Sequence, residues 1–101
     1  MTITAQLVSG VGFTPGSEQD LREGLVGYVT LTFADLLLLD ALVLRRTAAG
    51  RHALSFPSRT DRNGMRHAYY RPLDDRARRV IEDAVFRVLG VDRDPQEVVR
   101  G

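Results

Sequence analysis

The alternation of apolar and polar residues predicts two strands near the start of the chain. Residues 2–8 alternate loosely, and residues 25–33 alternate clearly. A period of two residues is typical of a strand with one buried face. Glycine and proline interrupt residues 9–24, so this segment is predicted to form a loop between the two strands.

A period of 3.6 residues predicts a long helix over 75–89. Asp74 precedes it and carries a side chain that can cap a helix, while Gly90 follows it as the expected stop. Arg78 and Glu82 stand four residues apart, a spacing at which opposite charges pair on an exposed helix face. The apolar stripe expected to face the core consists of Ala77, Ile81, Ala84, Val85, Val88 and Leu89.

Two shorter helical turns are also predicted. Ser17 can cap a turn over 18–23, with Asp20 in the place of the capping-box acid. Pro95 suits the first position of a turn over 94–100.

The apolar run over 34–46 is compatible with two structures. Its leucine and alanine content favours a helix. A short apolar run is also typical of a buried strand. Local propensity alone favours the helix.

A second pair of strands is predicted farther along the chain. The segment 51–59 alternates and predicts a strand that ends at Pro57, and residues 65–71 form the return strand. Pro72 closes that strand because it has no N–H to continue a ladder. The loop over 60–64 contains an Asn-Gly pair, which suits a tight hairpin turn.

The composition limits the classes of protein that this chain can represent. Its 101 residues, 44% of them apolar, correspond to one folded domain spanning 1–101, with its core in 25–89. The absence of cysteine excludes a disulfide framework, a cysteine zinc site and a thiol nucleophile. No apolar run is long enough to span a membrane and no signal-peptide pattern opens the chain, so we expect a cytoplasmic protein without a membrane partner. A domain this small gains core by pairing with a copy of itself, so a homodimer is expected.

The two histidines provide no pattern of a catalytic or metal site. His52 and His67 are not at His-x-x-x-His spacing, and no Gly-x-Ser-x-Gly motif frames a serine. We therefore expect no enzyme activity, no cofactor, no metal and no small-molecule substrate.

Positive charge is concentrated in the middle of the chain. Residues 41–79 carry ten arginines against three acids, a local net charge of +7, whereas the whole chain carries +1. All fourteen basic residues are arginine, whose planar fork fits phosphate groups and base edges. A genome rich in G and C would produce the same arginine bias, so the location of the charge is the stronger indication of a polyanionic partner.

The central segment also keeps the residue spacing of a known bacterial family. The matching positions are Pro57-Ser58-Arg59, Gly64, Pro72, Arg78, Ile81 and Asp83-Ala84-Val85. On these positions, residues 25–89 resemble the SpoVG family, the stage V sporulation or septation proteins. The chain departs from the family pattern at Thr60, Ala68, Arg71 and Val80.

The resemblance implies a fold and a function. It implies an extended segment over 36–46, and therefore an α+β protein with a small antiparallel β-sheet and a C-terminal helix packed on it, pairing as a dimer. SpoVG-like proteins bind DNA or RNA as regulators of gene expression and division, and they are not enzymes. The resemblance leaves open whether DNA or RNA is the partner here.

Nine arginines and two tyrosines are the candidate nucleic-acid contacts. Several arginines within reach of one backbone would neutralise phosphates, and the start of the long helix would add backbone donors. Tyr69 and Tyr70 would point to opposite faces of a regular strand, so that one packs in the core and the other can stack on an unpaired base. The arginines are Arg45, Arg46, Arg59, Arg62, Arg66, Arg71, Arg76, Arg78 and Arg79.

The alternative function is a protein-interaction module linked to cell division or septation, without direct nucleic-acid binding. The apolar run over 36–46 is rich for a small monomer to bury. An exposed strand edge or the basic face would then dock an acidic protein.

Overall fold

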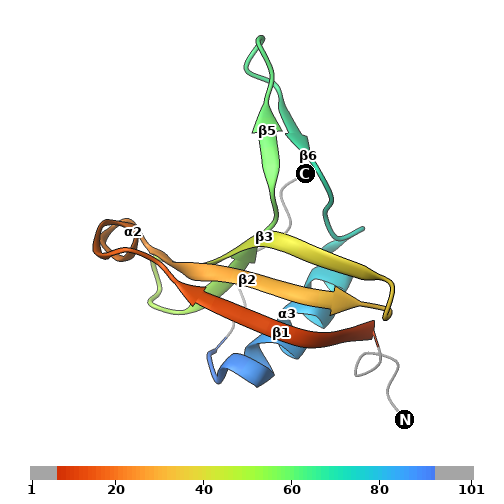
Figure 1. Cartoon of the computed structure of the whole chain (residues 1–101). Coiled ribbons are helices and arrows are strands. Elements are labelled where there is room, and N and C mark those ends of the chain that lie inside the picture. Colours follow the sequence, from red (N-terminus) through yellow and green to blue (C-terminus); the bar gives the residue numbers. More distant parts are fainter. Residues whose placement is uncertain (1–6, 93–101) are drawn as a thin grey trace.

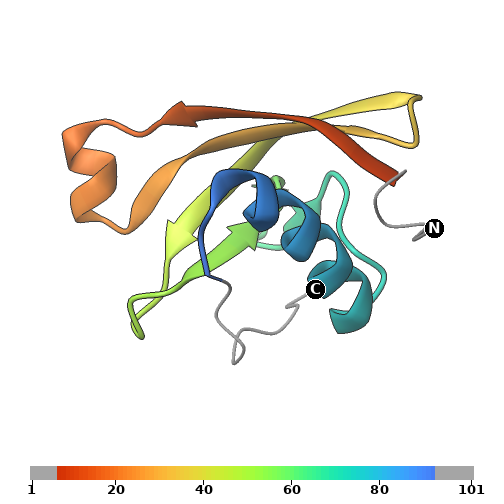
Figure 2. The same ribbon diagram turned by 90° about the horizontal axis from the view of Figure 1, so that it is seen from below.

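A four-stranded antiparallel sheet with one long helix against one face forms the body of the protein (Figures 1 and 2). The computed structural model describes residues 7–92, so the predicted turn over 94–100 lies outside the described residues. The strands of the sheet are, in order, β1 (Val8–Pro15), β2 (Leu25–Phe33), β3 (Leu37–Arg46) and β4 (His52–Ser55). The other elements are α2 (Glu18–Arg22), a two-stranded sheet of β5 (Ser58–Thr60) and β6 (Arg66–Ala68), and α3 (Asp75–Leu89). The predicted α+β class, an antiparallel sheet with a C-terminal helix, is confirmed.

The core lies between the sheet and α3. Figure 2 shows the helix crossing one face of the sheet. Fully burying a valine, leucine or phenylalanine side chain contributes about 1.5–3 kcal/mol, so each member of this cluster is a substantial source of stability. Its buried members are Val8, Val29, Leu31, Leu42, Leu44, Leu54, Val85 and Phe86.

The ambiguous apolar run forms β3, as the family resemblance implied and against its local propensity. Leu42 and Leu44 alternate inward and are buried; their cross-strand partners are Val29 on β2 and Leu54 on β4. Pairing on both sides therefore overrides the helix preference of the leucines. The beginning of the run is not buried: Leu36, Leu37 and Leu38 are 84%, 57% and 68% exposed.

The first strand of the sheet runs through residues that the sequence pattern assigned to a loop. β1 starts at Val8, so the expected loop over 9–24 is wrong in its first half, and most of the strand expected over 2–8 lies outside the described residues. The glycines are accommodated by a bulge, in which Gly10 adopts a φ of 54°. A Cβ atom on Gly12 would lie 2.7 Å from Thr30 Oγ1. The glycines that indicated a loop are therefore requirements of a bulged strand.

Both predicted helix starts are confirmed. At α2, Asp20 N–H donates to Ser17 Oγ at 3.1 Å and Ser17 N–H donates to Asp20 Oδ2 at 2.9 Å, which completes the capping box. At α3, Asp74 Oδ1 accepts the backbone N–H of Ala77 at 2.8 Å. Gly90 ends α3 with a left-handed φ of 71°.

The buried face of α3 differs from the predicted apolar stripe. Val85 is buried as expected, but Val88 is 65% exposed. Arg78 and Glu82 take part of the buried face, with residue exposures of 4% and 0%, so their expected pairing on an exposed face is wrong. Glu82 Oε2 accepts the backbone N–H of Leu54 at 2.8 Å, and this bond to the sheet helps to set which side of the helix turns inward.

The second pair of strands is shorter than predicted and is divided between two sheets. The strand expected to end at Pro57 ends at Ser55 as β4, and a further strand that was not predicted, β5, begins at Ser58 in the separate sheet. Pro57 lies in the break, where it has no N–H to continue a ladder. The return strand expected over 65–71 is limited to β6.

The turn between β2 and β3 is built from residues poorly suited to it, which gives a stability prediction. Ala34 and Asp35 have φ values of 54° and 56°, and Leu36 N–H donates to Phe33 O at 3.0 Å, as in a type I′ turn. Asn-Gly is the preferred pair for this turn. The double variant that carries both Ala34→Asn and Asp35→Gly should be more stable than the wild type by about 1 kcal/mol. The melting temperature should rise by about 4–8 °C in a thermal denaturation experiment.

The turn between β3 and β4 provides a matched control. Ala48 and Ala49 occupy its two central positions, and neither has a positive φ. The same Asn-Gly replacement at these positions should give no gain, because glycine then only adds freedom to the unfolded chain. An equal rise in melting temperature for both double variants would contradict the explanation by left-handed backbone.

Candidate nucleic-acid interface

The hairpin of β5 and β6 projects from the body of the protein (Figure 1). Residues 58–68 are called the arginine hairpin here, because they hold three arginines and a single acid. Its strands pair with each other and belong to neither edge of the four-stranded sheet. Tyr69 N–H donates to Pro57 O at 3.0 Å and closes the base of the hairpin. The arginine hairpin is therefore a separate structural feature with most of its surface in solvent.

Asp61 organises the turn of the arginine hairpin. Its Oδ1 accepts the backbone N–H groups of Asn63 and Met65, both at 2.9 Å, and its Oδ2 lies 2.7 Å from Nε2 of His67. Gly64 supplies the positive φ of 80°, whereas Asn63 does not. The hydrogen bond from His67, followed by those from the backbone, holds the pKa of the Asp61 carboxyl below its ordinary value. The stabilisation that the ionised carboxylate gives the turn is present above its unfolded pKa and is lost as the pH falls through the lower folded value.

The three arginines of the hairpin are exposed, and they differ in whether the side chain makes a hydrogen bond. The side chains of Arg59 and Arg62 make no hydrogen bond or ion pair within residues 7–92. Arg66 donates from Nε to Ser58 Oγ at 2.8 Å, a contact across the two strands. The only acid of the hairpin, Asp61, is engaged with the turn and His67, so the positive charge of these arginines faces solvent.

The remaining arginines predicted to form one surface lie at two other places. Arg46 N–H donates to the backbone oxygen of Gly24 at 2.7 Å, which puts this end of β3 beside the end of α2. Arg45 is half-buried there and donates from Nε to Ser55 Oγ at 2.7 Å. Arg71 and Arg76 are exposed around the start of α3. The predicted set of nine is therefore divided among the arginine hairpin, the α2 end of the sheet and the start of α3.

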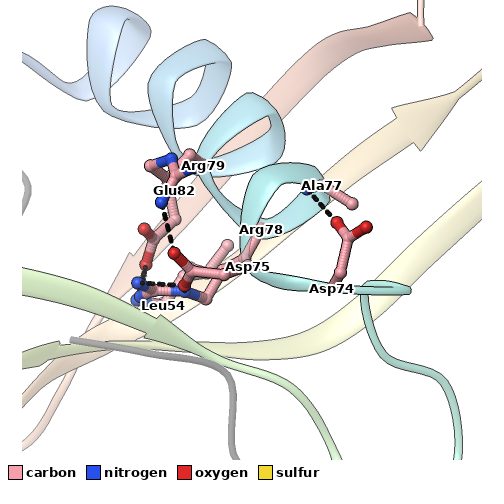
Figure 3. A network of polar contacts seen from close by, with 7 residues as sticks. All are labelled: Leu54, Asp74, Asp75, Ala77, Arg78, Arg79 and Glu82. Atoms are coloured by element: carbon pink, nitrogen blue, oxygen red, sulfur yellow. Dashed lines mark hydrogen bonds and ion pairs between the residues drawn. The ribbon is translucent and has the colours of Figure 1, made fainter.

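In α3, Arg78 and Arg79 form ion pairs with acidic side chains of the same helix (Figure 3). Arg78 Nη1 contacts Glu82 Oε2 at 3.2 Å, and its Nη2 contacts Asp75 Oδ1 at 3.1 Å. Arg79 forms an ion pair with the other oxygen of Asp75. Arg78 is 4% exposed, so the assignment of Arg78 as a nucleic-acid contact is corrected: its guanidinium pairs inside the protein with Asp75 and with Glu82, and Glu82 in turn joins α3 to β4.

The N-terminus of α3 is also closed to a phosphate. Asp74 Oδ1 accepts one of the first free N–H groups, as Figure 3 shows. Asp75 adds a second carboxylate in the first turn. Two carboxylates next to the helix N-terminus repel an anion. They already interact with the positive end of the helix dipole, where a phosphate would otherwise bind. The backbone donor site that the sequence indicated at this helix start is therefore used by the protein itself.

One tyrosine packs in the core and the other is exposed, as expected, although both lie beyond the end of β6 and not in a regular strand. Tyr70 packs against the core cluster, with its ring edge-on to Phe56 at a centroid distance of 6.1 Å, and its hydroxyl donates to the backbone oxygen of Asp40. Burial, and then the charge of Asp40, raise the pKa of Tyr70, so the hydroxyl keeps the proton that it donates. Tyr69 is 66% exposed beside the base of the arginine hairpin and is the one of the pair available for stacking.

Other kinds of site have little support in the described part of the chain. Among residues 7–92 no three acidic or histidine side chains converge on a possible metal position. An apolar pocket of about 210 Å³ opens between the sheet and the end of α3, which is smaller than typical ligand pockets of about 300–1,000 Å³. No helix in the described residues is long and apolar enough to cross a membrane. The pocket is lined by Phe13, Val26, Leu44, Leu89 and Val91, none of which offers a polar side chain.

Three of the positions that carry the SpoVG resemblance, Pro57, Gly64 and Pro72, have structural roles in this fold. Pro57 separates β4 from β5, Gly64 supplies the left-handed residue of the turn, and Pro72 is buried ahead of α3. These three residues determine the shape of the arginine hairpin and the path of the chain from the hairpin to α3, and they add no charge to it. No protein-family model matches the chain, and no curated protein is significantly similar to it.

Proposed function

We propose that this protein binds nucleic acid through the arginine hairpin and acts as a bacterial regulatory protein of the SpoVG type. The observation that carries the proposal is a projecting hairpin with three exposed arginines, whose only acid is engaged in its own turn. Each arginine that reaches a backbone phosphate releases condensed counterions, which drives binding without reference to sequence. The resemblance of residues 25–89 to SpoVG-like proteins supports the same function.

The salt dependence of binding tests this function. The protein would be titrated against labelled DNA and RNA, single-stranded and duplex, at salt concentrations from about 0.05 to 0.2 M. We expect the logarithm of the affinity to fall linearly with the logarithm of salt, with a slope of about −2 if two arginines contact phosphates of duplex DNA and about −3 if all three do. Absence of binding to all four ligands at the lowest salt would overturn the proposal.

A protein-interaction module linked to cell division or septation is the second candidate, and one observation favours it. Leu36–Leu38 are 84%, 57% and 68% exposed at the end of the β2–β3 hairpin. Exposed apolar residues in a group are typical of protein contact sites. Pairing of two copies through these leucines would bury them and form the expected homodimer. A concentration-dependent dimer in sedimentation, together with no binding to nucleic acid, would favour this candidate over the first.

A further inference from the structure

The shape of the arginine hairpin indicates which nucleic acid it fits, provided that the proposed function holds. β5 and β6 form a two-stranded antiparallel ribbon that stands clear of the sheet and of α3 (Figure 1). The major groove of B-form DNA is about 12 Å wide and admits a two-stranded ribbon. The major groove of an A-form RNA duplex is deep and narrow, and side chains do not reach its base edges. A ribbon of this kind therefore favours duplex DNA.

The two faces of the ribbon carry different side chains. Arg59 lies opposite His67, so these two share one face. Thr60 lies opposite Arg66 on the other face. Ser58 and Ala68 form the next pair on that second face, which therefore combines one arginine with three small residues. Small side chains let the backbone approach the floor of a groove, and the second face is the one that can come close to base edges.

Arg66 is held in a position suited to base recognition. Its Nε donates to Ser58 Oγ at 2.8 Å, which orients the guanidinium plane. It makes no other hydrogen bond or ion pair within residues 7–92, so its two terminal nitrogens keep their donors. An arginine with two free terminal donors matches the O6 and N7 acceptors of guanine in the major groove.

We propose that the arginine hairpin enters the major groove of B-form duplex DNA, where Arg66 donates two hydrogen bonds to the O6 and N7 atoms of a guanine. Arg59, on the opposite face, and Arg62, in the turn, contact the phosphates that flank the groove. Arg66 then determines the base preference, and the other two arginines supply affinity that is independent of sequence.

The test uses matched short ligands of one G-rich sequence: a DNA duplex, the same duplex with 7-deazaguanine in place of guanine, an RNA duplex and single-stranded DNA. The intact protein should bind the DNA duplex at least about tenfold more tightly than the RNA duplex, because only the B-form groove admits the ribbon. Removing the guanine N7 acceptor should weaken binding by about tenfold without changing the salt slope.

Two variants assign the base contact. Arg66→Lys keeps the charge but loses the planar fork with its two parallel donors, so it should reduce the preference for the unmodified duplex and retain the salt slope. Arg59→Lys is the matched control, because a lysine still serves a phosphate, and it should keep the preference for the unmodified duplex. Circular dichroism would check that both exposed substitutions leave the fold intact.

The outcomes separate the two proposals. If no ligand is bound, the proposed function fails and this inference fails with it. If the RNA duplex or single-stranded DNA is bound as tightly as the DNA duplex, the groove is wrong while nucleic-acid binding stands. If the wild-type protein binds the 7-deazaguanine duplex as well as the unmodified one, the guanine contact of Arg66 is overturned.

Discussion

Replacing Arg78 by alanine is expected to lower the free energy of unfolding by about 3–5 kcal/mol, because the buried carboxylate of Glu82 would lose its ion pair with Arg78. Glu82 is 0% exposed and cannot regain water without moving α3 away from the sheet. A domain of this size has a total stability of about 5–15 kcal/mol, so the loss is a large share of it. Urea denaturation of the wild-type protein and of the variant, followed by circular dichroism, measures the difference.

Arg79→Ala is the matched control for this effect. Arg79 is the next residue of the same helix and shares Asp75 with Arg78, but its side chain is 45% exposed. An exposed ion pair contributes about 0–1 kcal/mol, so this variant should be only slightly less stable than the wild type. Equal losses for the two variants would show that burial of the Arg78–Glu82 pair is not the cause.

A double replacement separates charge burial from hydrogen bonding. Arg78→Met together with Glu82→Leu removes both charges and keeps apolar volume, which commonly restores stability. The backbone N–H of Leu54 then loses the acceptor that it reaches at 2.8 Å, at a cost of about 1–3 kcal/mol. The double variant should therefore lie between Arg78→Ala and the wild type.

The second large effect is expected for binding rather than for stability. Replacing Arg59→Gln and Arg62→Gln together should weaken the affinity for duplex DNA by roughly 50-fold at 0.1 M salt, since each lost phosphate contact removes about 0.9 from the salt slope. The slope itself should become less steep by about 2. Fluorescence anisotropy titrations over the same salt range measure both quantities.

Two arginines outside the hairpin provide the control for total charge. Arg22 lies on α2 and Arg87 on α3, and both are exposed. Replacing both by glutamine changes the net charge by the same amount as the hairpin double variant. Their combined loss should leave the salt slope unchanged; a decrease equal to that of the hairpin variant would mean that net charge, and not the arginine hairpin, governs binding.

The features that sequence predicts well here depend on near neighbours in the chain. Ser17 and Asp20 form their capping box within four residues, and Asp74 caps α3 over three. The alternation of β2 is equally local, and its predicted and observed bounds agree. These signals need no knowledge of the rest of the fold, because the interacting groups are adjacent.

The features that local propensity and pattern miss depend on contacts far along the chain. The leucines of β3 are extended only because β2 and β4 pair with them, which a helix propensity does not register. Glu82 turns inward to reach a backbone group 28 residues away. The spacing of Arg78, Glu82 and Val85 places them on one helix face, and this spacing was the signal in the sequence that Arg78 and Glu82 could be buried together with Val85.

The candidate site shows the same division. The concentration of arginines in residues 41–79 indicated the middle of the chain, where the arginine hairpin lies, but charge counting could not separate the exposed Arg62 from the buried Arg78. The role of Asp61 was also missed. Its position two residues before Asn63 is the sequence signal of an Asx turn, which the hydrogen bonds to Asn63 and Met65 realise.

The attachment of the arginine hairpin outside the main sheet has a consequence for how the protein can change. Substitutions at exposed surface positions away from caps and buried pairs usually alter stability by less than about 0.5 kcal/mol. Arg59, Arg62 and Arg66 are at such positions, whereas the residues that hold the fold lie between the sheet and α3. Ligand preference can therefore diverge among descendants, or be altered by engineering, while the same folded body is retained.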